Sequence, residues 1–236
     1  MDAVESVTAE SRAAALEAAL EVRTRELQAA TEQRMALVHE LDHRVKNNLQ
    51  LVSCLLQMQA RRAQDATVRA ALDSMLERLH AIGTVHRRLF QREDLSWFDV
   101  SDFVRDLVGE AAAAAERRHI RFACDLTPVE APARVAGPIA LLVNELLSNA
   151  VHHAFPDGRP GRIWVRVGRD EQGIRIEIAD DGVGMGGPDG KLAGDGSGFG
   201  LTIVDLLSRQ LQARIRREGP PGLRTEVTLP PAFVRG

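Results

Sequence analysis

Apolar residues in the first part of the chain repeat with the period of a long helix. Between residues 16 and 41 they follow one another at steps of three, four and seven residues, which forms a heptad seam. Arg23 and Arg34 fall on this seam, so it predicts a short and imperfect coiled coil. The apolar positions of the seam are Leu16, Leu20, Leu27, Ala30, Leu37 and Leu41.

Two further apolar stripes predict a helical hairpin. The first stripe runs through residues 41–56, the polar stretch 61–65 interrupts it, and the second stripe runs through residues 68–82. The first 90 residues contain no proline and a single glycine, Gly83, which also favours helix. Because one hairpin cannot bury both stripes, we expect two copies of the chain to pair in a four-helix bundle.

The second half of the chain contains strand patterns. Apolar and polar residues alternate at 162–167 and 174–178, which predicts neighbouring strands joined by a turn that contains glycine. Two more strands are expected at 214–218 and 223–229. The second half is therefore expected to contain a sheet of at least these strands.

Three helices are expected around these strands, at 99–115, 137–153 and 201–212. Ser101 is the expected N-cap of the first of them, because its hydroxyl can accept a bond from a free amide of the first turn. The predicted fold class is α+β, with helices packed on a mixed sheet.

Composition and charge exclude several classes of protein. The chain of 236 residues has 30 basic and 33 acidic side chains, so its net charge of −3 gives no basic surplus for nucleic acid. No apolar run approaches the roughly 18 residues that a membrane span needs. Cys54 and Cys124 form no CxxC pair. These features predict a cytoplasmic protein that binds no nucleic acid and has no membrane span.

The helix around His43 has one polar face. If Leu41 and Val45 face the core of the bundle, His43 lies about 200° around the helix from each and points to solvent. An imidazole beside cations suits a site that receives a phosphoryl group. The alternative is an ordinary solvated helix face. The helical neighbours of His43 are His39, Lys46, Asn47 and Gln50.

The expected helix at 137–153 carries two polar side chains on one face of a mostly apolar segment. Glu145 and Asn149 lie four residues apart, so they stack on that face. The side-chain oxygen of Asn149 is a ligand that Mg²⁺ accepts, with phosphates and water completing the shell. Glu145 is placed to orient or deprotonate an attacking group. Alternatively, the asparagine only caps a loop.

Two glycine-containing segments follow. Asp180 and Asp181 precede Gly182 and Gly184 at the end of the second predicted strand. A carboxylate there can accept a hydrogen bond from the amine of adenine, and glycines let the backbone approach a planar ring. The segment 196–201 is rich in glycine and opens a helix, where backbone amides suit phosphate. This order differs from Rossmann and P-loop proteins, in which the glycine turn follows the first strand.

These segments resemble, in order, the boxes of a known kinase family. Residues 43–50 (HRVKNNLQ) resemble the H-box of bacterial sensor histidine kinases of the HRXXN type, which are related to the HWE kinases. Residues 144–150, 180–184 and 196–201 resemble the N, G1 and G2 boxes of the GHKL ATPase superfamily. The G1 box lacks the tryptophan typical of HWE kinases, which favours the HRXXN type.

The resemblance implies a division of the chain into three parts. Residues 1–36 would form an N-terminal coiled-coil helix, and residues 37–92 a helical-hairpin domain for dimerisation that carries the phosphoacceptor histidine. Residues 97–233 would form an α/β-sandwich domain of the GHKL type that binds ATP.

The same resemblance implies roles for individual residues. His43 would be the phosphoacceptor, Asn149 the ligand of Mg²⁺ and Asp180 the residue that binds adenine, while residues 185–197 would form a lid over ATP. Glu145 would act on the attacking group. The nucleotide-binding positions would further include Gly182, Gly184, Gly196, Gly198, Gly200 and Leu201.

Two departures from the family pattern change this expectation. Where the family often has a lysine near the end of the N-box, this chain has His152 and His153, so the cation that faces the phosphates would depend on pH. The commoner histidine kinases have an acidic residue directly after the phosphoacceptor, whereas here Asp42 and Glu40 precede it. The sequence leaves open which carboxylate assists the transfer, and Asp42 is the adjacent one.

The implied activity is autophosphorylation of His43 from ATP and Mg²⁺, followed by transfer to an aspartate in the receiver domain of a response regulator. The expected partners are that regulator, a second copy of the chain and an upstream sensor protein. Two alternatives stay open at this point. One is a histidine phosphotransferase without kinase activity, and the other is a GHKL serine kinase in which the helices serve only to dimerise.

Overall fold

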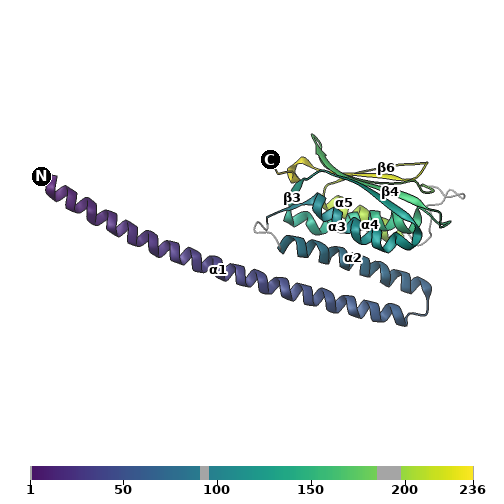
Figure 1. The fold of residues 1–236 in the computed structure, drawn as a ribbon, viewed down its shortest axis with the longest axis horizontal. Coiled ribbons are helices and arrows are strands. Elements are labelled where there is room, and N and C mark those ends of the chain that lie inside the picture. Colours follow the sequence, from purple (N-terminus) through teal and green to yellow (C-terminus); the bar gives the residue numbers. More distant parts are fainter. Residues whose placement is uncertain (1, 91–95, 185–197, 236) are drawn as a thin grey trace. The chain divides into compact units, whose positions relative to one another are not determined.

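The structure is a computed structural model that describes residues 2–90, 96–184 and 198–235. The chain divides into two units, residues 1–48 and residues 49–236. The boundary falls within α1 (Asp2–Arg62), the long helix at the N-terminus in Figure 1. No helix in the described part of the chain combines the length and apolar character that crossing a bilayer requires.

The predicted hairpin is confirmed. α1 ends at Arg62, and α2 (Ala66–Phe90) begins after a short turn. Asp65 in this turn accepts a hydrogen bond from the backbone amide of Thr67 at 2.7 Å. This bond lowers the pKa of Asp65 because it stabilises the ionised carboxylate. The polar interruption of the stripe is therefore a helix stop followed by a capped helix start.

A five-stranded mixed sheet forms the centre of the second half. Its order is β2-β4-β5-β7-β6, in which β2 pairs with β4 in parallel and all other neighbours are antiparallel. The four predicted strands are confirmed as β4 (Gly161–Asp170), β5 (Gly173–Asp180), β6 (Arg214–Glu218) and β7 (Arg224–Leu229).

Three strands were not expected from the sequence. β2 (Ile120–Leu126) lies at an edge of the main sheet, and β1 (Trp97–Asp99) and β3 (Glu130–Pro132) form a separate two-stranded sheet. In β2 both Cys124 and Asp125 are exposed, so the strand lacks a regular alternation of apolar and polar residues. The other two strands are too short to show a period.

Helices cover one face of the main sheet (Figure 1). They are α3 (Val100–Ala115), α4 (Ala136–His153) and α5 (Gly198–Gln210), close to the predicted ranges. Ile139 and Val143 of α4 and Ile163 and Ile174 of the sheet are fully buried between the two layers. The predicted α+β class, with an α/β sandwich after a helical hairpin, is confirmed.

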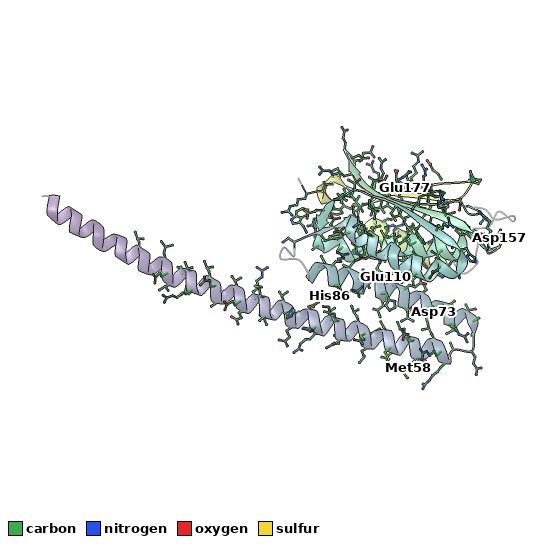
Figure 2. The ribbon with its side chains drawn as sticks, viewed as in Figure 1. Met58, Asp73, His86, Glu110, Asp157 and Glu177 are labelled. Atoms are coloured by element: carbon green, nitrogen blue, oxygen red, sulfur yellow. The ribbon has the colours of Figure 1, made fainter. Side chains whose placement is uncertain are left out.

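The opposite face of the main sheet carries charged side chains. Glu177 alternates along β5 with the buried Ile176 and Ile178, and therefore points away from the helices (Figure 2). It pairs with Arg166 of the neighbouring strand at 3.1 Å. The alternation thus separates the apolar core face from a face of paired charged side chains, on which Glu177 is itself buried.

The predicted N-cap of α3 is wrong. Asp99, not Ser101, caps the helix, because Asp99 Oδ1 accepts hydrogen bonds from the amides of Ser101 and Asp102 at 2.7 and 3.1 Å. Ser101 lies inside the first turn, where its hydroxyl donates to the carbonyl of Thr127. The helix begins one residue after Asp99, so its free amides meet that carboxylate first.

Candidate functional site

Asp180 lies at the end of β5 with one carboxylate oxygen engaged by the backbone. Its Oδ1 accepts hydrogen bonds from the amides of Gly182 at 2.9 Å and Leu223 at 3.2 Å. The residue is 8% exposed, and this burial raises its pKa, although the two amide bonds oppose the shift. Because both amides use Oδ1, Oδ2 is the oxygen left to accept a bond from a ligand.

Asp181 connects the end of β5 to the neighbouring segment of the chain. Its side chain accepts a hydrogen bond from the amide of Arg162 at the start of β4, at 2.7 Å, and its carbonyl accepts one from the guanidinium of Arg159. These bonds hold the end of β5 on the neighbouring strand. The two adjacent acids therefore bond different backbone amides, and the expected contact of Asp180 with a nucleotide base stays a prediction.

The loop after β5 packs directly on the end of α4. The amide of Val183 donates to the carbonyl of Ala154 at 3.0 Å, and a Cβ built on Gly182 would lie 2.3 Å from that same carbonyl oxygen. Gly184 has a φ of 72°, and its Cβ would lie 2.6 Å from the carbonyl of Gly222. Close packing of the loop thus requires these two glycines. Their expected contact with a nucleotide stays a prediction.

The start of α5 lies against the polar face of α4. A Cβ on Gly200 would lie 3.1 Å from Glu145 Oε2 and 3.9 Å from Asn149 Oδ1. Glu145 and Asn149 therefore share one face of α4 as predicted, and the first turn of α5, with Gly198 and Leu201, is its neighbour. The expected lid at 185–197, which includes Gly196, lies outside the described residues.

Glu145 is paired with an arginine that the sequence did not indicate. Arg78 of α2 binds it with two hydrogen bonds, Nε to Oε1 at 2.6 Å and Nη2 to Oε2 at 2.9 Å. The side chains of Arg78 and Glu145 are 16% and 5% exposed. In this conformation Glu145 does not have the free carboxylate expected of a residue that deprotonates an attacking group. No local motif joins two helices so far apart in sequence, so sequence patterns missed this pair.

The two histidines at the end of α4 differ in their surroundings. Nδ1 of His152 lies 3.2 Å from Ser148 Oγ, and Ser148 Oγ donates to Glu77 of α2 at 2.8 Å. Burial lowers the pKa of His153, and the nearby His152 and Arg118 lower it further. The cation expected at His153 therefore forms at a more acidic pH than at an unperturbed histidine.

His43 lies on α1 in the first unit and is exposed. Its ring meets that of His39 edge to face, with 5.0 Å between the centroids. Lys46 binds Asp42 at 2.6 Å, one turn along the same helix. Adjacent helical residues diverge by about 100°, and this ion pair turns the Asp42 carboxylate toward Lys46. The expected help of Asp42 at His43 stays a prediction.

Among the described residues, no group of three or more His, Cys, Asp or Glu side chains is arranged to hold a metal ion.

Two family models match most of the chain. Residues 40–115 match the family model described as histidine kinase. Residues 135–233 match the model described as histidine kinase-, DNA gyrase B- and HSP90-like ATPase. The chain belongs to the histidine kinase family. The two matches cover the part of α1 that holds His43, the rest of the hairpin, and the part of the sandwich that holds Asp180 and Asn149.

Individual kinases are similar to large parts of the chain. Sensor histidine kinase PdtaS of Mycobacterium tuberculosis is 31% identical over 198 residues, which cover 82% of this chain and 39% of that protein. Blue-light-activated histidine kinase 2 of Erythrobacter litoralis is 32% identical over 156 residues, which cover 62% of this chain and 43% of that protein. This histidine kinase chain thus spans about two fifths of these relatives.

A solved structure supports the fold. The histidine kinase domain of the Erythrobacter litoralis EL346 blue-light-activated histidine kinase superimposes with a TM-score of 0.61 and 24% identity. The match covers 83% of this chain and 93% of that domain. The order of hairpin and sandwich is therefore that of a known histidine kinase domain.

Proposed function

We propose that this chain phosphorylates its own His43 from ATP and passes the phosphoryl group to an aspartate in the receiver domain of a response regulator. The observation that carries the proposal is the arrangement around α4. The loop with Asp180 packs on one end of this helix, and the start of α5 lies beside Asn149 and Glu145. The relatives named sensor histidine kinase support the same activity.

The residues present fit a nucleotide with Mg²⁺. Asp180 Oδ2 would accept a bond from the amine of adenine, and Asn149 would give Mg²⁺ a neutral oxygen. The first turn of α5 would offer backbone amides to the phosphates. Mg²⁺, when bound, would neutralise part of the phosphate charge.

Phosphoryl transfer requires mainly that the protein position the reacting groups. A ring nitrogen of His43 donates its lone pair to the γ-phosphorus, the bond from that phosphorus to the bridging oxygen breaks, and ADP leaves. Glu145 would accept the proton that the phosphorylated ring then releases. In the second step a carboxylate oxygen of the regulator displaces the imidazole from phosphorus, and His43 is restored.

We further propose that the chain forms a homodimer through its hairpin. Apolar side chains of α1 and α2 are exposed in the single chain: Leu51 is 63% exposed, Leu55 is 55%, Met58 is 46% and Val68 is 50%. A contiguous exposed stripe of this kind favours burial against a partner. A second copy would supply the two helices that complete a four-helix bundle.

Mixed dimers are expected to separate the two halves of the reaction. A chain with His43→Gln keeps an ATP site, and a chain with Asn149→Asp keeps a phosphoacceptor beside an altered Mg²⁺ site. We expect each homodimer to be inactive and label from γ-labelled ATP to appear on the Asn149→Asp chain when the two are mixed. Different tags on the two chains show which chain carries the label, and light scattering verifies that the chains form dimers. No label in verified mixed dimers would show transfer within one chain.

The direct test of the proposed function is incubation with γ-labelled ATP, followed by mapping of the labelled residue. Phosphohistidine is labile in acid and phosphoserine is not, so acid treatment separates histidine kinase activity from serine kinase activity. Label on His43 that passes to a receiver domain supports the proposal. Acid-stable label on another protein would favour the serine kinase, and binding without any label would favour a phosphotransferase.

A further inference from the structure

The loop between α4 and β4, residues 154–160, lies against the end of β5. At the start of this loop, the carbonyl of Ala154 accepts a hydrogen bond from the amide of Val183 at 3.0 Å. Near its end, the guanidinium of Arg159 donates a hydrogen bond to the carbonyl of Asp181. Arg159 therefore brings a positive charge to the residue next to the expected adenine contact, although none of the sequence motifs includes it.

The direction of the Arg159 side chain is set by its own loop. The guanidinium carbon lies over the ring of Phe155, 5.2 Å from the centroid, and Phe155 is only 7% exposed. A Cβ built on Gly161 would lie 2.1 Å from this ring, so the start of β4 closes on it. Nε of Arg159 also lies 3.9 Å from Oδ2 of Asp157. Because a cation is attracted to the face of an aromatic ring, the buried ring holds the guanidinium in place.

The groups around Asp180 shift its pKa in opposite directions. Burial is the largest cause that raises this pKa, and the negative charge of Asp181 on the same segment raises it further. The amides of Gly182, after β5, and Leu223, before β7, lower it because they bond Oδ1. The loop between α4 and β4 supplies the cation, and the charge of Arg159 lowers the pKa as well. Arg159 thus offsets part of the effect of burial.

The expected contact with adenine requires the ionised form of Asp180. An ionised carboxylate only accepts hydrogen bonds, whereas a protonated one carries a donor. The amine of adenine is itself a donor, so a proton on Oδ2 would set one donor against another. A cation that keeps Asp180 ionised therefore favours the binding of adenine.

The exposure of Arg159 separates this effect from support of the fold. Its side chain is 40% exposed and that of Asp157 is 59% exposed, and such surface ion pairs contribute little to stability. Without the guanidinium, the end of β5 keeps the bond of Asp181 to the amide of Arg162 at 2.7 Å. Loss of the guanidinium should therefore leave the fold in place and change mainly the charge beside Asp180.

We propose that Arg159 is a positioning residue for the nucleotide base, which holds the end of β5 and keeps the Asp180 carboxylate as the acceptor that adenine requires. The inference rests on the proposed function, because it names a residue that supports binding of the same nucleotide. Arg159 acts through Asp180 and takes no part in the transfer of the phosphoryl group. Its charge thereby contributes to the preference for adenine over guanine.

The test compares affinities for ATP with Mg²⁺ at pH 8 and at pH 5, measured by calorimetry. Arg159→Gln removes the charge and keeps a hydrogen-bond donor. We expect it to bind ATP about threefold more weakly than wild type at pH 8, and this deficit should grow about twofold or more at pH 5, because Asp180 then takes up its proton at a higher pH. ATP and the histidines of α4 titrate in both proteins, so the ratio of the two affinities isolates the effect on Asp180.

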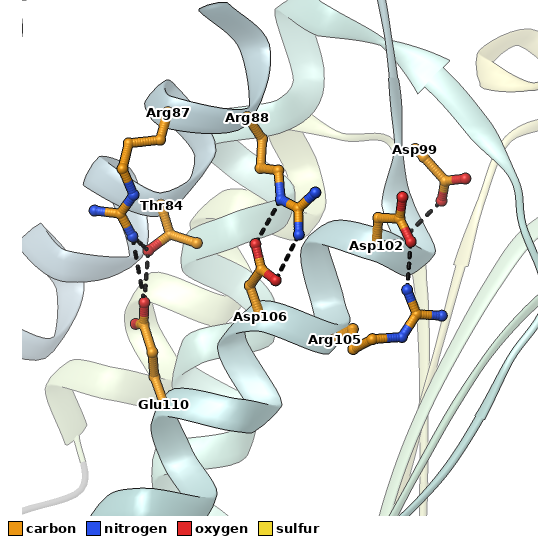
Figure 3. Close-up of polar contacts among 8 residues, drawn as sticks. All are labelled: Thr84, Arg87, Arg88, Asp99, Asp102, Arg105, Asp106 and Glu110. Carbon is orange, nitrogen blue, oxygen red and sulfur yellow. Dashed lines mark hydrogen bonds and ion pairs between the residues drawn. The ribbon is translucent and has the colours of Figure 1, made fainter. Parts of the chain in front are cut away.

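Two further variants test whether the charge is the cause. Arg159→Lys keeps a cation, so its deficit should be the same at both pH values. Arg105→Gln is the matched control, because it removes the same charge from an exposed pair with Asp102 on α3 (Figure 3). Its affinity should stay within twofold of wild type at both pH values. Melting temperatures verify that each variant is folded.

An equal deficit of Arg159→Gln at both pH values, or no deficit, would overturn the inference, because Arg159 would then only pack the loop or be dispensable. A deficit of Arg159→Lys that grows in acid as much as that of Arg159→Gln would overturn it as well. If Arg159→Gln does not fold, Arg159→Met, whose side chain can stay on the ring of Phe155, makes the same comparison.

Failure of the proposed function would be recognised separately. Wild type that binds ATP but acquires no label on His43 would overturn the proposed function, while the pH comparison would still decide the role of Arg159. Wild type that binds no ATP would overturn both.

Discussion

Replacing His43 with glutamine is expected to abolish labelling from γ-labelled ATP, to below 1% of the wild-type rate, while ATP binds within twofold as tightly. Glutamine keeps the helix and the polar character of the position but has no nitrogen lone pair to attack phosphorus. The affinity should hold because His43 belongs to the unit of residues 1–48, whereas Asp180 and Asn149 belong to residues 49–236. Filter assays of label and calorimetric titration with ATP measure the two quantities.

His39→Gln is the matched control for this prediction. Its ring lies one turn away and contacts that of His43, with 5.0 Å between the centroids. If His43 is the phosphoacceptor, the control should keep most of the labelling rate. Equal loss in both variants would point to a requirement for the helix face as a whole, and label retained in His43→Gln would contradict the assignment of the phosphoacceptor.

Elements with a strong local period could be predicted from the sequence, and elements defined by a distant partner could not. The hairpin, the three helices and the strands β4 to β7 follow their apolar patterns. β2 was missed because Cys124 and Asp125 interrupt its alternation at a sheet edge. The cap of α3 was assigned to Ser101 because a hydroxyl at a helix start suffices as a signal, although the acid two residues earlier reaches the amides first.

The site shows the same division. Asp180 lies in the short segment 180–184, and Glu145 and Asn149 lie in the short segment 144–150. The residue types and their spacing within each segment were therefore enough to identify them as candidate site residues. The ion pair of Asp42 with Lys46 could have been found from its spacing of four residues on a helix. The partner of Glu145 could not, because Arg78 reaches it only through the packing of α2 on α4.

Asp180→Asn is expected to weaken ATP binding at least a hundredfold and to leave the loop after β5 intact. The two backbone amides bond Oδ1, which asparagine retains. Asparagine puts an NH₂ group where Oδ2 would meet the amine of adenine, so donor faces donor. A lost bond to a charged acceptor costs about 1.5–3 kcal/mol, and the buried unpaired donor adds to this. Calorimetry with ATP and with GTP measures the loss of affinity and of base preference.

Asp181→Asn is the control for this variant, because its side chain bonds the amide of Arg162. Asparagine can keep that bond, so ATP affinity should stay within threefold of wild type. Equal weakening by both variants would show that the charge of the segment matters, not the contact of Asp180 with adenine. Comparable binding of GTP and ATP by the wild type would contradict the assignment of Asp180 outright.

Asp180→Asn should preserve or raise the thermal stability of the protein. A measurement of stability therefore separates a loss of ATP binding from a loss of fold. Burial raises the pKa of Asp180, so the folded protein favours the protonated acid more than the unfolded chain does. The stabilising effect of protonation is present in acid and is lost as pH rises through the folded pKa, so at pH 7 the ionised carboxylate costs stability. A neutral asparagine avoids this cost.

The melting temperature of Asp180→Asn at pH 7 should therefore equal or exceed that of wild type, and the difference should shrink as the pH is lowered toward the pKa of Asp180. A melting temperature several degrees below wild type at pH 7 would show that the loop needs the charge and that weak ATP binding follows from a damaged loop.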